Sequence, residues 1–234
     1  MTSLRSTAAL SMIGLIGLTL LAFWPTYLSR PFSTIDGYTH THAGLGALWL
    51  FMLLGQIFLI RSGRRDMHKA LGRASYLVAP LFFLSALLLA HFRFSRMDEA
   101  TFAREAYTLY LPLSVSVLFL GAYVLALVHL DRPRLHGCFM LCTAIVLLDP
   151  VVARTLAFHV VQLPKFWHYQ LITFPLGFLI LFVLLRGLPA HSRDRRAFAW
   201  FAGMVVFVQL LWFVAPRTAS WAAFADRFRQ LPLT

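Results

Sequence analysis

The chain has 234 residues, of which 59% are hydrophobic and 13% charged, and its mean hydropathy is +0.73. This composition excludes an ordinary soluble domain, because such a domain has about 45–50% apolar residues and a chain of this length could not hide so much apolar surface. The net charge of +12 does not indicate nucleic-acid binding. Most of the basic residues lie between apolar segments, where they set membrane topology and meet anionic lipid headgroups.

Seven apolar segments are long enough to cross a bilayer, which takes about 20 residues. They are Ala8–Leu28, Thr41–Ile60, Ala74–Phe92, Ala106–Leu130, Leu135–Phe158, Phe166–Leu185 and Ala197–Pro216. Since backbone groups in hydrocarbon must be hydrogen-bonded within the protein, all seven are predicted to be helices. The predicted fold is an all-α, polytopic bundle of seven transmembrane spans. The first segment exceeds a signal-peptide core of about 7–15 residues and lacks a small-residue cleavage site.

Basic residues gather at one end of the predicted bundle. The N-terminus and the turns after the second, fourth and sixth segments carry 12 basic and 3 acidic residues, whereas the opposite end carries 8 and 5. Because cytoplasmic segments carry the excess of Lys and Arg, the N-terminus is predicted to lie inside and the C-terminus outside. The predicted location is a bacterial inner membrane, with its anionic headgroups as partners.

Two short segments lie outside the predicted spans on the outer side. Residues 93–105 balance three bases against three acids and predict a short surface helix. Ser220–Gln230 places Trp221, Phe224 and Phe228 at spacings of three and four, which predicts an amphipathic helix lying on the membrane. We therefore divide the chain into a transmembrane domain, 1–216, and an outer amphipathic tail, 217–234.

Nine histidines are unusual in so apolar a chain, and all lie near the ends of predicted spans. On the outer side are His40, His42, His91, His159 and His168, and on the inner side are His68, His129, His136 and His191. Neutral imidazole binds haem iron, copper and zinc. Helical bundles build such sites from side chains on facing helices.

These positions predict three sets of ligands. They are His68 with His136 as an inner site, His42 with His91 or His159 as an outer site, and His40, His42 and His168 as metal ligands. The alternative is an interfacial role at headgroup depth. The inner and outer histidines of the third and fifth spans are 23 residues apart, which is ~34 Å of helix and roughly the whole hydrocarbon thickness.

Three polar residues inside predicted spans are costly in lipid and are therefore functional candidates. Asp149 and Arg154 lie in the fifth span, ~140° apart around a helix, so each is expected to find a partner on another helix. Gln56 lies in the second span. We predict a polar wall formed by these three residues and the outer histidines. Pro150 predicts a kink beside Asp149.

Several familiar chemistries have no motif in the chain. It contains no phosphate-binding glycine loop, no G-x-S-x-G elbow, no H-E-x-x-H and no C-x-x-C. The only two lysines, Lys69 and Lys165, lie outside the seventh span, which argues against a retinal Schiff base. Cys138 and Cys142 are four residues apart on one helix face and are interpreted as small packing residues, with a metal or redox pair as the alternative. The sequence leaves open whether the protein is an enzyme.

Three sequence motifs resemble those of an uncharacterised bacterial family of multi-pass membrane proteins with a domain of unknown function, over roughly residues 36–158. The motifs are His42-x-Gly44-x-Gly46 through Gly55-Gln56, His68-Lys69-Ala70-x-Gly72-Arg73, and His136-x3-Met140 through Arg154. The family's arrangement is distantly similar to membrane cytochromes b and ferric-reductase-like bundles. That similarity implies haem b held between histidines of neighbouring helices, with Arg154 as a candidate partner for a propionate.

Three hypotheses about function follow. The first is a haem- or metal-binding redox protein that passes electrons across or along the membrane. The second is a non-catalytic accessory or assembly subunit held by other membrane subunits. The third is a proton or small-solute permease that uses Asp149 and Arg154.

Overall fold

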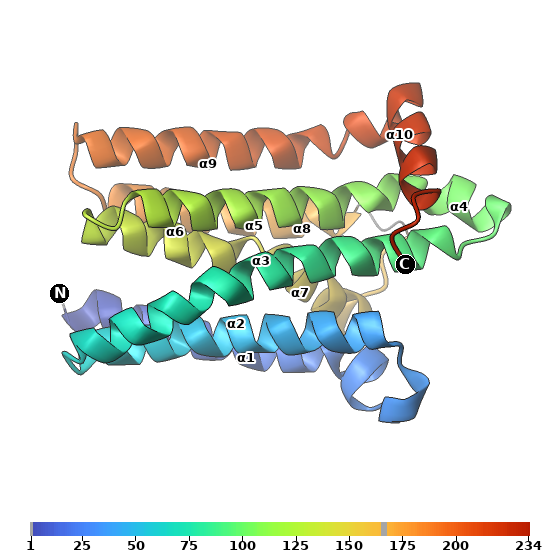
Figure 1. The fold of residues 1–234 in the computed structure, drawn as a ribbon. Helices are drawn as coiled ribbons and strands as arrows, with labels where there is room; N and C mark the ends of the chain where they lie inside the picture. The colour runs from blue at the N-terminus through green and yellow to red at the C-terminus, as the bar shows by residue number, and fades with distance from the viewer. Residues whose placement is uncertain (1, 165–167) are drawn as a thin grey trace.

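The computed structural model describes residues 2–164 and 168–234, and within these ranges every regular element is a helix (Figure 1). The longer helices are α1 (Thr2–Phe23), α2 (Gly37–Arg61), α3 (Arg65–Ser95), α5 (Tyr110–Val128), α6 (Pro133–Ile145), α8 (Gln170–Arg186) and α9 (Arg193–Leu211). The shorter ones are α4 (Glu99–Glu105), α7 (Leu148–Thr155) and α10 (Ala219–Arg229), with single turns η1 (Trp24–Leu28), η2 (Phe32–Thr34), η3 (Ala106–Leu109), η4 (Leu156–Val160) and η6 (Ala215–Arg217). The predicted all-α bundle is confirmed.

Six helical stretches of the described chain are long and apolar enough to cross a membrane. They are Ala9–Leu28, Gly37–Arg61, Arg65–Ser95, Glu99–Val128, Pro133–Val160 and Arg193–Arg217. The sixth predicted segment corresponds to α8, which has 17 residues and is shorter than the others. The start of that segment, at Phe166, lies outside the described residues. The lengths and composition are thus those of a multi-pass membrane protein.

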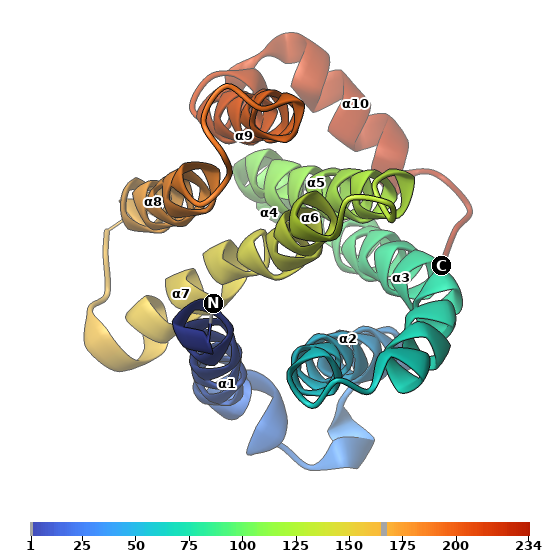
Figure 2. The same ribbon diagram turned by 90° about the vertical axis from the view of Figure 1, so that its left-hand side faces the viewer.

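The long helices run alongside one another, and their turns alternate between two ends (Figure 1). The N-terminus and the α2–α3, α5–α6 and α8–α9 turns share one end, here called the basic end. The other end carries α4, α10 and the C-terminus, and is called the capped end. Seen along the bundle, α6 and α7 lie between α1–α3 on one side and α8–α9 on the other (Figure 2). The predicted grouping of the basic turns is therefore present in the fold.

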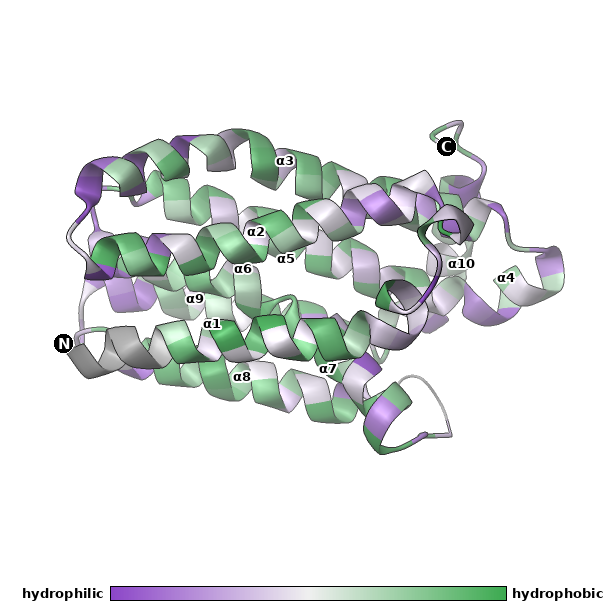
Figure 3. Cartoon of the chain, turned by 90° about the horizontal axis from the view of Figure 1, so that it is seen from below, coloured by the Kyte–Doolittle hydropathy of each residue, from purple (hydrophilic) through white to green (hydrophobic). Residues whose placement is uncertain are grey.

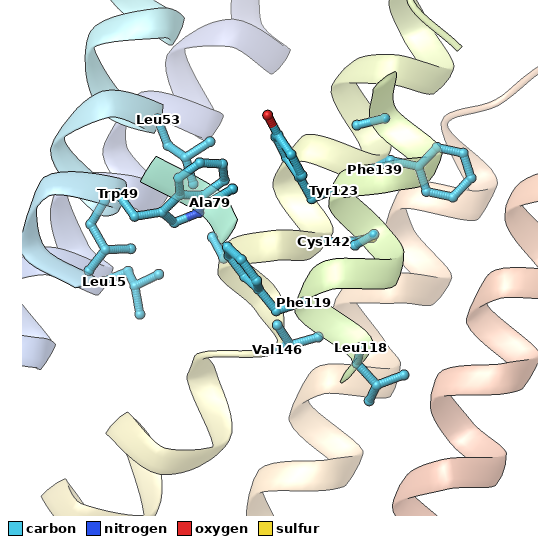
Figure 4. Close-up of a cluster of buried hydrophobic side chains, with 14 of the residues drawn as sticks. Leu15, Trp49, Leu53, Ala79, Leu118, Phe119, Tyr123, Phe139, Cys142 and Val146 are labelled. Carbon is cyan, nitrogen blue, oxygen red and sulfur yellow. The ribbon is translucent and has the colours of Figure 1, made fainter. Parts of the chain in front are cut away.

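Aromatic packing fills the centre of the bundle (Figure 4). The indole of Trp49, on α2, is 1% exposed and meets the rings of Phe119 and Tyr123 edge-on at centroid distances of 5.2 and 5.6 Å. Its Nε1–H donates to Thr143 Oγ1 on α6 at 3.1 Å. Hydrophobic residues also line the outer surface along the helices, while hydrophilic ones gather toward both ends (Figure 3). An apolar outer surface is what a lipid-facing bundle presents.

The C-terminal helix covers the capped end instead of lying free on the membrane. The apolar face of α10 packs against α3 and η3, with Ala225 fully buried and Trp221 Nε1–H donating to the Ala106 carbonyl at 3.0 Å. Arg229 binds Glu99 of α4 at 2.7 Å and Asp226 at 2.9 Å. The predicted amphipathic helix is present, but much of its apolar face is covered by protein rather than by lipid.

The start of α2 is fixed by a cap that also reaches α3. Asp36 accepts hydrogen bonds from the Thr39 N–H and hydroxyl, both at 2.8 Å, and pairs with Arg93 at 3.3 Å. Burial raises the pKa of Asp36, but the Thr39 hydrogen bonds and the Arg93 charge outweigh it, so the pKa lies below its ordinary value of 3.8. The carboxylate therefore stabilises the fold at neutral pH.

We expect Asp36→Ala to lower the free energy of unfolding at pH 7 by about 1 kcal/mol, through loss of the cap. Asp36→Asn should cost less, because asparagine caps helices as well as aspartate does. The pKa of Asp36 is lower in the folded protein than its ordinary value of 3.8. The stabilisation that the ionised carboxylate provides is therefore complete above pH 3.8, and it is lost as the pH falls through the folded-state pKa. Unfolding in detergent, followed at pH 7 and near pH 3, checks this; an undiminished gap between wild type and Asp36→Ala in acid would contradict it.

Candidate polar site at the helix break

The fifth predicted span is broken in two. α6 ends at Ile145 and α7 begins at Leu148, and a tight turn joins them in which the Leu147 N–H bonds the Ala144 carbonyl at 3.1 Å. Pro150, in the first turn of α7, accounts for the break: it has no N–H to donate to the Val146 carbonyl, so the hydrogen-bond ladder of α6 cannot continue into α7. An interrupted helix at membrane depth is tolerated where it is buried in protein or lines a cavity.

Asp149 lies in the first turn after this break and is buried, with 5% of its surface exposed. Its Oδ1 accepts a hydrogen bond from the Thr173 hydroxyl on α8. Gln170, one turn earlier on α8 and 1% exposed, faces the same carboxyl group. Among residues 2–164 and 168–234, no basic side chain forms an ion pair with Asp149. Within the described ranges, the carboxyl group thus has polar neighbours but no counter-charge.

A cavity of about 10 Å³ adjoins the carboxyl group, about the room that one water molecule needs. Val146 and Asp149 line it from the break, Thr173 from α8 and Gln209 from α9. The Gln209 Oε1 at the cavity is buried and lacks a hydrogen-bond partner within the described chain, as do both amide atoms of Gln170, which lies outside the cavity lining. Buried polar atoms are normally satisfied by protein or water. This arrangement offers several donors and acceptors to a small polar guest.

The predicted polar wall is not formed. Gln56 is half-buried and donates from Nε2 to the His68 carbonyl at 3.1 Å, which places it next to the start of α3 at the basic end. Arg154 is exposed on the bundle surface, where its guanidinium covers the Phe23 ring at 4.9 Å. Arg154 therefore does not meet Asp149, and its long side chain covers apolar surface of α1 instead.

The histidines of the predicted outer site turn toward different elements. The His42 ring stacks on Phe82, with a hydrogen bond between its Nδ1 and Ser85 on α3 at 3.0 Å. His91 is buried and bonds through Nδ1 to Thr234 Oγ1 at 2.7 Å. His159 donates from Nε2 to the carbonyl of Leu21, on α1, at 2.9 Å. These bonds hold the three rings against three separate neighbours.

The predicted metal ligands are similarly engaged. The two ring nitrogens of His40 bond the Tyr27 hydroxyl and the Phe32 carbonyl, each at 3.0 Å. His168 lies in the turn before α8. Over residues 2–164 and 168–234, no group of three or more His, Cys, Asp or Glu residues is placed to hold a metal ion. Cys138 and Cys142 are free thiols.

The two histidines of the predicted inner site lie at the same end of the bundle. His68 is in the first turn of α3 and His136 in the first turn of α6, both at the basic end. The His136 Nδ1–H donates to the Ala126 carbonyl at 2.9 Å, which leaves the Nε2 lone pair free to bind a ligand. The Nδ1 atom of His68 is buried and has no hydrogen-bond partner in the described chain. The pair therefore has one oriented and one unsatisfied imidazole.

Sequence reasoning found Asp149 but missed its neighbours Gln170, Thr173 and Gln209. A signal was present, because Gln170 and Thr173 are three residues apart and so share a face of an otherwise apolar helix. Comparison of the chain with protein-family models, with curated proteins and with solved structures finds no match.

Proposed function

We propose that this protein conducts protons across the membrane through the site at the α6–α7 break, with Asp149 as the proton-carrying group. The observation that carries the proposal is a buried carboxyl group that forms no ion pair with the residues the structure describes, placed beside a water-sized cavity at a break in a helix. An ionisable residue in a span is expensive to keep, and carboxyl groups of this kind form the proton relays of pumps and transporters.

The neighbours of Asp149 suit a group that changes its protonation state. The Thr173 hydroxyl donates to the ionised carboxylate and can accept from the neutral acid, because a hydroxyl serves as donor or acceptor. The amide groups of Gln170 and Gln209 offer both roles as well. Val146, whose carbonyl loses its helical partner to Pro150, also lines the cavity. The Asp149 carboxyl group can thus keep hydrogen-bond partners both when it is protonated and when it is ionised.

The proposal is tested with purified protein in liposomes that enclose a pH-sensitive dye. A pH step with a potassium–valinomycin clamp should produce proton entry faster than in protein-free liposomes, and entry should scale with the amount of protein. Flux equal to that of protein-free liposomes, from protein shown to be folded by circular dichroism, would overturn the proposal.

We further propose that the chain crosses a bacterial inner membrane seven times with its N-terminus inside, α8 being the short sixth span. The excess of basic residues at the basic end supports this orientation. A reporter fused after Thr234 should then be active only outside, and one inserted within 61–69 only inside. A C-terminus labelled from the cytoplasm would reverse the orientation or change the number of spans.

A second candidate function, redox chemistry, is favoured by two histidines at the basic end, His68 with a buried Nδ1 that has no hydrogen-bond partner in the described chain and His136 with a free Nε2. These two residues would hold a haem or a metal ion, with the His136 Nε2 as one ligand. We expect His68→Ala and His136→Ala each to remove the same Soret band or bound metal, while His191→Ala, in the exposed α8–α9 turn, keeps it. Protein from haem-supplied cells that is colourless and free of metal would rule this candidate out.

A further inference from the structure

A second cavity opens at the basic end, where α8 meets α9, and is independent of the Asp149 site. Its volume is about 630 Å³, within the range of small-molecule binding sites. His191, Ser192, Arg195 and Arg196 line one part of it. Leu185 and two alanines, Ala190 and Ala199, line the rest. The cavity thus combines a cationic wall with an apolar one.

The cationic wall is not neutralised by its neighbours. Asp194, the nearest acid in the chain, is bound by Arg132 of the α5–α6 turn at 3.1 Å. Neither Arg195 nor Arg196 forms an ion pair or a side-chain hydrogen bond with the residues that the structure describes. Their guanidinium groups are therefore available to an anion, and the planar fork of arginine matches a phosphate bidentately.

The surroundings of the cavity are those of a membrane interface. Trp200 follows Arg196 by one turn of α9 and is 83% exposed, as expected of a tryptophan at headgroup level. On α8, the Arg186 guanidinium lies over the Phe182 ring at 5.9 Å, and Phe182 is itself exposed. A phosphate group bound here would have aromatic and aliphatic surface directly beneath it, at the level where acyl chains begin.

We infer that this cavity binds the phosphate headgroup of an anionic phospholipid such as phosphatidylglycerol. Arg195 and Arg196 bind the phosphate, and Leu185 and Ala199 contact the glycerol backbone and the first acyl carbons. A bound lipid would hold the turn between α8 and α9, the helices that carry Thr173 and Gln209. The lipid site does not depend on the proposed proton conduction, and its test does not measure proton flux.

The test measures lipids that stay bound when the protein, purified in micelles with equal phosphatidylcholine and phosphatidylglycerol, is examined by native mass spectrometry. The double variant Arg195→Gln/Arg196→Gln should lose phosphatidylglycerol affinity at least about tenfold, since it removes the two guanidinium groups that bind the phosphate directly. The matched double variant Arg61→Gln/Arg64→Gln removes two charges at the same end but away from the cavity, and should change affinity less than about twofold.

A third variant separates shape from charge. Ala199→Phe places a ring on the apolar wall where the glycerol backbone and first acyl carbons would lie, keeps every charge and lies at an exposed position. It should therefore fold normally and still lose the bound phosphatidylglycerol. Retention of the lipid by either cavity variant, or an equal loss in the Arg61/Arg64 control, would overturn the site. Displacement of the lipid by millimolar inorganic phosphate would show that free phosphate, not a lipid, is the ligand.

Discussion

Asp149→Asn is expected to lower the proton flux of the reconstituted protein by about 100-fold or more, the effect typical of removing a proton-transfer group. Asparagine keeps the size of the side chain and an oxygen that accepts from Thr173, so the fold should survive. What is lost is the ability to gain and release a proton. Asp149→Glu, which keeps the acid but lengthens it in a cavity of about 10 Å³, should retain a reduced flux.

The control for this variant is Asp98→Asn at the capped end. Asp98 caps α4 through hydrogen bonds to Thr101 at 2.8 and 2.9 Å, and asparagine can serve as the same cap. Its flux should equal that of the wild type. Wild-type flux from Asp149→Asn would remove Asp149 from the pathway, even if the protein as a whole proved to conduct protons.

Trp49→Ala is expected to produce the largest loss of stability, about 3–5 kcal/mol. The substitution empties the space between Phe119 and Tyr123 and removes the hydrogen bond to Thr143 that links α2 to α6. Trp49→Phe should cost less, because it keeps an aromatic ring in place. Equilibrium unfolding in mixed micelles with increasing dodecyl sulfate measures both values.

The matched control is Trp200→Ala, since Trp200 is 83% exposed and packs little against the protein. Its free energy of unfolding should change by less than about 0.5 kcal/mol, as for other surface substitutions. A similar loss from both tryptophan variants would mean that the bundle is held by lipid contacts at its surface and not by the aromatic centre.

The helical bundle could be predicted from the sequence because a bilayer restricts which secondary structures a chain can form. Long apolar segments in lipid must be helices, and alternating basic turns group at one end whatever the packing between helices is. Helix bounds were less predictable. α3 extends from Arg65 to Ser95, well beyond the predicted segment 74–92. The apolar run marks only the part of a helix that lies in hydrocarbon, and the polar residues on either side of it can continue the helix. The packing of α10 on protein could not be predicted, because an amphipathic pattern fits a lipid surface and the end of a helix bundle equally well.

The site was predictable only in part, for a related reason. Asp149 stands out in any apolar run, but its partner depends on how α8 is rotated against α7, which Gln170 and Thr173 reveal only once the helices are packed. The direction of the Arg154 side chain was not predictable, because depth along a helix does not tell which way a long side chain turns. The number of histidines at span ends alone overstates the ligands available, because some of them are already hydrogen-bonded, as His40 is through both ring nitrogens.

Whether Asp149 changes its protonation state is the most direct question to ask of this protein. Infrared difference spectroscopy of the reconstituted protein across a pH titration reports the C=O stretch of each protonated carboxyl group. The proposal predicts a carboxyl band that appears and disappears reversibly with pH, shifts in Thr173→Val, where the hydrogen bond is lost, and is missing in Asp149→Asn. A difference spectrum of Asp149→Asn that matches the wild type would contradict a proton-carrying role for this residue.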